Sequence, residues 1–230
     1  MNEIIIGTSN YNSIHKLCNE ARINSKLFVI IGYPGAGKTT ALEVFCENNE
    51  NAYYMRVGSS MGAKHFYAKL LNILGVEGRD AGSSLHDLIN QVSFKLNYDS
   101  TKKLIVIDEA GKFKPKFLEY LHELRDNTIK NTGIILAGPE YFHDRMKIWR
   151  NKGLVGIPEF YRRINHWEYL SPPTKAEKRA MCEVYQVESD EDIQEIILTC
   201  ESFSEIKDAI DSYHIMKQNN AQKTTVKKQV

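Results

Sequence analysis

The stretch "FVIIGYPGAGKTTALEVF", from Phe28 to Phe45, joins an apolar run, a glycine-rich bend and the start of a helical pattern. A short apolar run that ends at a turn signal is typical of a strand buried on both faces, as in parallel sheets. The glycines of the bend permit backbone conformations that other residues avoid. The stretch therefore predicts a strand, a tight loop and a helix, which is the repeating unit of an α/β sheet.

The bend itself matches the pattern G-x-x-x-x-G-K-[ST]. In this pattern backbone N–H groups surround phosphate oxygens at a helix N-terminus, the lysine neutralises the β and γ phosphates, and the hydroxyl holds magnesium. We therefore expect ATP and Mg²⁺ as cofactors. The expected nucleotide-binding residues of the bend are Gly32, Pro34, Gly35, Ala36, Gly37, Lys38, Thr39 and Thr40, with Thr39 as a magnesium ligand.

Further apolar runs alternate with helical patterns along the chain, which favours a P-loop α/β core with a five-stranded parallel sheet. Three helices are also expected, one ending at Gly75, one opened by a serine N-cap, and one with Pro115 in its first turn. The remaining strands are expected at "AYYMRV" (52–57), "KLIVID" (103–108), "TGIILAG" (132–138) and "INHWEYL" (164–170).

The pattern changes at "SPPTKAE", where two prolines interrupt the chain and the residues after Thr174 read as helix. Thr174 to Glu177 and Ser202 to Glu205 both have the spacing of a capping box. We expect a core over residues 1–172, a small C-terminal helical lid over 173–216, and a basic, flexible tail over 217–230 that carries four lysines.

Composition excludes a strongly basic surface, because 30 basic residues stand against 29 acidic ones. Any contact with nucleic acid must therefore come from a local patch. The four cysteines are widely spaced and form no metal-ligand pattern with the histidines, which favours free thiols in a reducing compartment. The N-terminus lacks a signal-peptide pattern and no run approaches a membrane span, so we expect a cytoplasmic protein without membrane contact.

The run "KLIVIDEAGKF" supplies a second nucleotide motif, because a buried strand ends in Asp108 and Glu109 follows. Asp108 can hold the magnesium shell, and Glu109 can orient a water for in-line attack on the γ-phosphate. A carboxylate that activates water separates ATP hydrolases from small-molecule kinases. We therefore predict Mg²⁺-dependent ATP hydrolysis.

The segment "PEFYRRINHWEYLSPP" contains two adjacent arginines, Arg162 and Arg163. A guanidinium at a subunit edge can reach the γ-phosphate of a neighbouring copy and stabilise its transition state. This role requires a homo-oligomer. The alternative is that the pair is solvated or salt-bridged within its own chain.

The order of these motifs, with a helical lid after the fifth strand, resembles the AAA+ ATPases. The runs "LHELRDNTIKNTGIILAGPEYF" (121–142) and "YRRINHWEYLSPPTKAE" (161–177) are most similar to DNA-transposition ATPases of the MuB and TnsC type, with ExeA-like relatives. The resemblance implies an ATPase that forms a ring or filament on duplex DNA, selects target DNA for a transposase or integrase, and disassembles on hydrolysis. It implies the roles above for the matching positions, which are Lys38, Thr39, Asp108, Glu109 and Arg163.

Two sensor positions of the AAA+ pattern differ in this chain. Glu140 is the polar residue nearest the end of the fourth strand, and the lid has Ser204, with Lys207 one turn later, where a second sensor arginine is common. A missing cation near the γ-phosphate predicts slow hydrolysis. The DNA-contact candidates are Lys64, Arg79, Lys112 and Lys114, for which solvated surface side chains are the alternative.

Two other functions remain open at this point. One is a different AAA+ task, such as helicase loading or secretion-linked energy transduction. The other is a nucleotide-gated scaffold that binds ATP and a protein partner with little turnover, which the irregular sensor positions motivate.

Overall fold

The structure is a computed structural model that describes residues 5–76 and 82–227, with side chains up to residue 219. The chain forms two compact units. The larger unit contains Asn12–Tyr33 and Lys38–Leu170, and the smaller one contains the segment up to Tyr11, the loop Pro34–Gly37 and the chain from Ser171 onward. Each unit has its own core.

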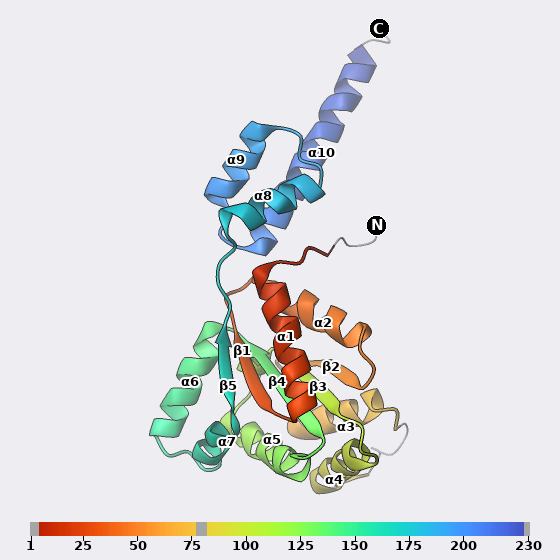
Figure 1. Cartoon of the computed structure of the whole chain (residues 1–230), viewed down its shortest axis with the longest axis vertical. Helices are drawn as coiled ribbons and strands as arrows, with labels where there is room; N and C mark the ends of the chain where they lie inside the picture. Colours follow the sequence, from red (N-terminus) through yellow and green to blue (C-terminus); the bar gives the residue numbers. More distant parts are fainter. Residues whose placement is uncertain (1–4, 77–81, 228–230) are drawn as a thin grey trace. The chain divides into compact units, whose positions relative to one another are not determined.

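The larger unit is built on a five-stranded sheet in which every neighbouring pair is parallel, so the predicted fold class is confirmed (Figure 1). The three inner strands are buried along their whole length, as their continuous apolar runs predict. In sheet order the strands are β2 (Ala52–Arg56), β3 (Lys103–Asp108), β4 (Thr132–Gly138), β1 (Leu27–Ile31) and β5 (His166–Tyr169).

Helices connect these strands, and local sequence signals set several of their ends. Ser84 caps the fourth helix in a full capping box, Pro115 opens the fifth, and Gly75 follows the third with a φ of +78°. The helices are α1 (Ser9–Asn24), α2 (Lys38–Glu47), α3 (Ala63–Ile73), α4 (Leu85–Asn97), η1 (Ala110–Lys112), α5 (Pro115–Asn127), α6 (Glu140–Asn151) and α7 (Ile157–Arg163).

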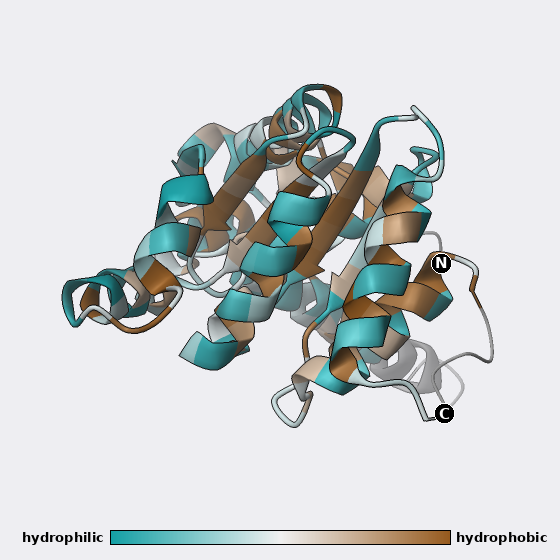
Figure 2. Cartoon of the chain, turned by 90° about the horizontal axis from the view of Figure 1, so that it is seen from below, coloured by the Kyte–Doolittle hydropathy of each residue, from teal (hydrophilic) through white to brown (hydrophobic). Residues whose placement is uncertain are grey.

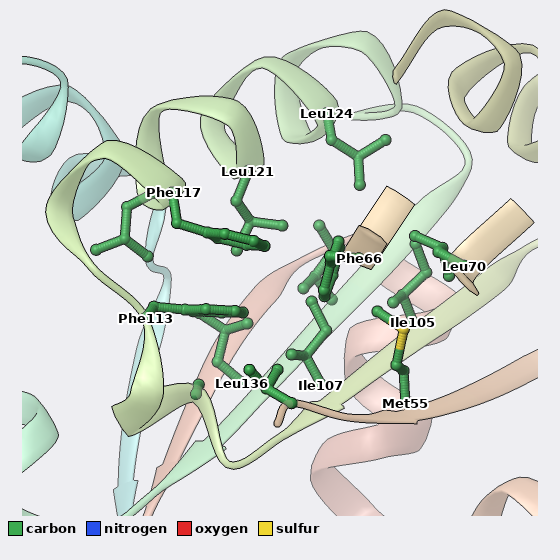
Figure 3. Close-up of a cluster of buried hydrophobic side chains, with 14 of the residues drawn as sticks. Met55, Phe66, Leu70, Ile105, Ile107, Phe113, Phe117, Leu121, Leu124 and Leu136 are labelled. Carbon is green, nitrogen blue, oxygen red and sulfur yellow. The ribbon is translucent and has the colours of Figure 1, made fainter. Parts of the chain in front are cut away.

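The main core lies between one face of the sheet and helices α3 to α7. Figure 3 shows side chains of β3 and β4, including Ile107 and Leu136, directed toward Phe66 of α3 and Leu121 of α5. Figure 2 shows apolar strands between helices whose outward-facing sides are polar. The apolar stripe of each helix therefore covers the sheet and holds its strand ends in place.

Helix α1 packs against β4 so closely that a glycine is required there. A Cβ atom at Gly133 would lie 2.1 Å from the backbone oxygen of Ala21. Any other residue would push the end of α1 away from the sheet. This contact explains the glycine in the "TGI" segment. β4 itself lies between the two strands that carry the nucleotide motifs.

The smaller unit contains α8 (Lys175–Val184), α9 (Asp190–Thr199) and α10 (Phe203–Lys227), packed around Ile193, Ile206 and Ile210. Thr174 and Glu177 form the expected capping box, and Ser202 and Glu205 exchange the same two hydrogen bonds. α10 continues to Lys227, so the backbone is helical over residues 217–227, where the sequence predicts a flexible tail.

Across residues 5–76 and 82–227, every helix is too short or too polar to cross a membrane.

Candidate active site

The glycine-rich loop connects β1 to the first turn of α2. Gly35 and Gly37 both have a φ of +80°, a left-handed conformation that favours glycine. Among the described residues, no atom lies within 4 Å of the position that a Cβ atom of Gly37 would take. Because α2 begins at Lys38, its unpaired backbone N–H groups lie at the loop, where an anion is favoured.

Lys38 extends back over this loop. Its ammonium group donates to the carbonyl oxygens of Gly32, at 2.6 Å, and Tyr33, at 2.9 Å. Burial lowers the pKa of Lys38, although nearby carboxylates, among them Asp108 and Glu109, act in the opposite direction. A partly desolvated ammonium that donates to two neutral carbonyl oxygens fits a site that receives phosphate anions.

Asp108 ends β3 with its side chain buried, at 2% exposure. Its Oδ2 atom accepts hydrogen bonds from the Thr39 hydroxyl at 2.7 Å and from the Tyr54 hydroxyl at 3.0 Å. Burial, together with the carboxylates of Asp108 and Glu43, raises the pKa of Tyr54, so this phenol stays protonated and remains a donor.

The Thr39 and Asp108 side chains offer the hard oxygen ligands that Mg²⁺ prefers. In the described residues, no three histidine, cysteine or acidic side chains are grouped in a way that could hold a metal ion. The pair of Thr39 and Asp108 fits Mg²⁺ in particular, since this ion usually takes one or two protein ligands and completes its shell with water and substrate phosphates.

Glu109 follows in a left-handed conformation, with a φ of +62°. Its backbone N–H donates to Asp108 Oδ1 at 2.7 Å. Its two carboxylate oxygens face two cations, Arg56 at 3.3 Å and Lys112 at 3.4 Å. Arg56 is in register with Asp108 on the neighbouring strand, so the pairing of β2 with β3 brings it to Glu109.

The turn after Glu109 is fixed by the helix that follows β4. Arg145 of α6 donates to the carbonyl oxygen of Gly111 at 2.9 Å, and its guanidinium lies 4.6 Å from the ring centre of Trp149. A Cβ atom at Gly111 would lie 2.8 Å from Pro139, so the turn packs directly on the β4–α6 connection. The sequence pattern does not distinguish Arg145, because its spacing in α6 resembles that of any surface arginine.

The two sensor candidates have different surroundings. Glu140 is exposed at the first position of α6, and its charge opposes the lowering of the Lys38 pKa by burial. Lys207 in the smaller unit is paired with Asp211 and lies 5.1 Å from the ring centre of Tyr185.

The two arginines at the end of α7 also differ. Arg163 forms a two-pronged ion pair with Asp126 of α5, at 2.7 and 2.9 Å. This hydrogen bonding, with smaller contributions from His122 and Arg125, lowers the pKa of Asp126. Arg162 is exposed and makes no hydrogen bond or ion pair with the residues that the structure describes.

Three of the four predicted DNA-contact residues can be placed. Lys64 is exposed in the first turn of α3, and Lys114 is exposed just before α5. The two segments meet, because the rings of Phe66 and Phe113 are 6.0 Å apart. The Lys112 ammonium donates to the carbonyl oxygen of Val57 and forms an ion pair with Glu109. Arg79 lies outside the described residues.

Comparison with known proteins identifies the family and the fold of this chain. The AAA domain family matches residues 22–146. The chain is 24% identical over 199 residues to the Mu-like prophage FluMu DNA transposition protein B of Haemophilus influenzae, which covers 84% of this chain and 65% of that protein.

Solved structures with the same fold include two ORC proteins of Aeropyrum pernix. The ORC2 protein, solved as ADPNP–ADP complexes, has a TM-score of 0.73 at 14% identity and covers 96% of this chain and 65% of its own. The ORC1 protein in complex with DNA has a TM-score of 0.70 at 12% identity, and the match covers 95% of this chain and 62% of the ORC1 chain. The chain therefore belongs to the AAA domain family and has the α/β fold of the AAA+ ATPases.

Proposed function

We propose that this chain is a Mg²⁺-dependent ATPase that assembles on duplex DNA without sequence selection and selects target DNA for, or activates, a transposase or integrase. One observation carries the proposal. The Thr39 hydroxyl and the Asp108 carboxylate lie 2.7 Å apart beside Lys38, in a chain whose sequence is similar to a DNA transposition protein over 84% of its length.

The residues of the site divide the work in the proposed reaction. Lys38 would exchange its two carbonyl partners for phosphate oxygens, and Thr39 and Asp108 would hold Mg²⁺. When bound, this ion neutralises charge on the phosphate oxygens. Glu109 would orient the attacking water and accept its proton, which requires its carboxylate to turn toward the γ-phosphate.

The contacts of Glu109 favour slow turnover of the isolated chain. Its oxygens are paired with Arg56 and Lys112, and these two cations would compete with a water at the γ-phosphate for the carboxylate. Partly exposed ion pairs of this kind are each worth only about 0.2–1 kcal/mol. A phosphate group that competes for Arg56 or Lys112 would therefore release the carboxylate, which is how assembly on DNA would stimulate hydrolysis in this proposal.

Assembly would complete the site with an arginine from a second copy. Arg162 is available for this role, since Arg163 is bound to Asp126 of its own chain. An arginine supplied in this way neutralises charge that develops on the transferred phosphoryl group. The proposed active form is therefore a ring or a helical filament.

The proposed DNA surface consists of the start of α3 and the turn before α5. Lys64 and Lys114 are exposed on segments that pack together through Phe66 and Phe113, and Lys112 adjoins them. Lysines that contact phosphates give affinity without reading the base sequence. Binding should consequently weaken steeply as the salt concentration rises.

The test is binding of the purified protein to random-sequence duplex DNA with ATP, a non-hydrolysable analogue, ADP or no nucleotide, with particle length followed by electron microscopy. Filaments or rings that require ATP are expected. Lys38→Ala should abolish them, whereas Lys26→Ala, at an exposed lysine before β1, should not. The absence of DNA binding with every nucleotide, even at low salt, would contradict the proposal.

A second candidate is a nucleotide-gated scaffold with little turnover. The ion pairs of Glu109 and the acidic Glu140 near Lys38 favour it, because both features oppose hydrolysis. A scaffold would lose partner recruitment with Lys38→Ala, keep it with Glu109→Gln, and release no phosphate as the wild-type protein. ATP-dependent phosphate release that DNA increases would exclude it.

A further inference from the structure

The buried carboxylate of Asp108 has one hydrogen-bond donor that belongs to neither nucleotide motif. Its oxygens accept from the Glu109 backbone at 2.7 Å, from the Thr39 hydroxyl at 2.7 Å and from the Tyr54 hydroxyl at 3.0 Å. Tyr54 comes from β2, which lies at the edge of the sheet. We propose that Tyr54 is a positioning residue of the magnesium site, whose hydroxyl fixes the orientation of the Asp108 carboxylate.

The strand register explains how Tyr54 reaches this carboxylate. Tyr54 pairs with Val106 on β3, so Asp108 lies two residues further along the same face of the neighbouring strand. A diagonal neighbour at this separation is within reach of an aromatic side chain but not of a short one. Tyr53 points to the opposite face, where it packs against the main core.

The position of the hydroxyl makes it specific for one carboxylate oxygen. Thr39 and Tyr54 both donate to Oδ2, while the Glu109 backbone occupies Oδ1. Glu43 of α2 also interacts with the phenol, but the hydroxyl has a single proton to donate. With that proton on Oδ2, neither oxygen of the carboxylate can rotate away from its partner without loss of a hydrogen bond.

The consequence for metal binding follows from the demands of the ion. Mg²⁺ requires near-ideal octahedral geometry, whereas Ca²⁺ accepts a flexible arrangement of oxygens. Groups that orient metal ligands affect affinity by about 10–100-fold when they are removed. Loss of the Tyr54 hydroxyl should therefore weaken Mg²⁺-dependent nucleotide binding and should weaken Ca²⁺-dependent binding less.

The inference rests on the proposed Mg²⁺-dependent ATPase, and its test uses binding rather than activity. Affinity for a fluorescent ATP analogue is measured in excess EDTA and over a range of Mg²⁺ and Ca²⁺ concentrations. The proteins are the wild type, Tyr54→Phe and the matched control Tyr53→Phe, with thermal melting of each. Tyr54→Phe should raise the half-saturating Mg²⁺ concentration by about tenfold and leave the affinity in EDTA unchanged.

Three results would overturn the inference. Tyr54→Phe could match Tyr53→Phe at every Mg²⁺ concentration, which would show that the hydroxyl does not act on the metal site. It could weaken binding equally in EDTA and Mg²⁺, which would place its effect on the loop or on folding. If wild-type binding is independent of Mg²⁺, the magnesium part of the proposed function fails first, and the inference fails with it.

Discussion

Two regions of the larger unit carry the charged groups that the proposed reaction needs, and they differ in how they are completed. At the ends of β1 and β3, Asp108 is 2% exposed and satisfied by donors from its own chain. At the end of α7, Arg163 and Asp126 form an ion pair with both side chains 39% exposed, and Arg162 extends into solvent. Asp108 therefore has its hydrogen-bond donors within one copy of the chain, whereas the exposed Arg162 is placed where a second copy would have to supply its partner.

Replacing the exposed arginine tests the second region most directly. Arg162→Ala should lower the rate of hydrolysis in the assembled state by about 10³-fold, because a trans-acting arginine contributes at least this much in related phosphoryl transfers. ATP affinity of the isolated chain should stay the same. The measurement is phosphate release as a function of protein concentration, with DNA present.

Arg162→Lys serves as the conservative variant for this prediction. It should not restore the rate, because an ammonium lacks the planar fork of a guanidinium. If Arg163→Ala shows the loss and Arg162→Ala does not, the two arginines have the reverse roles.

A change at Glu109 tests the completeness of the first region. Glu109→Gln should slow hydrolysis by about 10²-fold or more, because the amide cannot accept a proton from water. Binding of ATP should be retained, so an ATP-bound complex on DNA should accumulate. Single-turnover hydrolysis measures the effect, and a wild-type rate would show that another group orients the water.

The anchor of the turn after Glu109 should have an effect on folding. Arg145→Met keeps much of the side-chain stem but loses the hydrogen bonds to the carbonyl oxygens of Gly111 and Phe113, so the free energy of unfolding should fall by about 1.5 kcal/mol. Arg150→Met is the matched control on the same helix, where the arginine stacks on Tyr161. Denaturant titration of both variants gives the comparison, and equal losses would show that the hydrogen bonds are not the cause.

The exposed ion pair at the end of α7 should contribute less. Arg163→Ala should lower the free energy of unfolding at pH 7 by at most about 1 kcal/mol, since the pair is open to solvent. The pKa of Asp126 is lowered in the folded state, so this stabilisation is present above the ordinary aspartate pKa of about 3.9 and is lost as the pH falls below it. Unfolding titrations at pH 7 and pH 3 should show the difference shrink, and a constant difference would assign it to packing.

The smallest effect is expected at Arg56. Arg56→Ala removes one of the two cations that hold Glu109, so basal hydrolysis without DNA should rise by about two- to fivefold. The remaining pair with Lys112 limits the increase. Steady-state phosphate release measures it, and a decrease would mean that Arg56 has a direct part in the reaction.

The predictable parts of the molecule were those encoded by short stretches of chain. The loop residues, the serine cap of α4 and the proline at the start of α5 were read from local patterns, because caps and tight turns depend on a few adjacent residues. The three inner strands were predictable because buried parallel strands are continuous apolar runs, whereas the edge strands β2 and β5 are mostly half-buried or exposed.

Contacts across the sheet were not predictable in the same way. No sequence pattern distinguishes Tyr54 or Arg56 from other residues of the strand. Their roles depend on the register in which β2 pairs with β3, since a shift of one residue would turn both side chains to the other face. The ion pair of Arg163 with Asp126 likewise depends on the packing of α7 near α5.

By itself the sequence determined the family, the parallel sheet and the order of Lys38, Thr39, Asp108 and Glu109 along the chain, because each motif is local and self-consistent. Only the tertiary structure decided which partners these groups have. It placed Tyr54 on Asp108, two cations on Glu109, and Asp126 on one of two adjacent arginines. The physical reason is that such partners come from different strands and helices, and their distances are set by register and packing rather than by spacing along the chain.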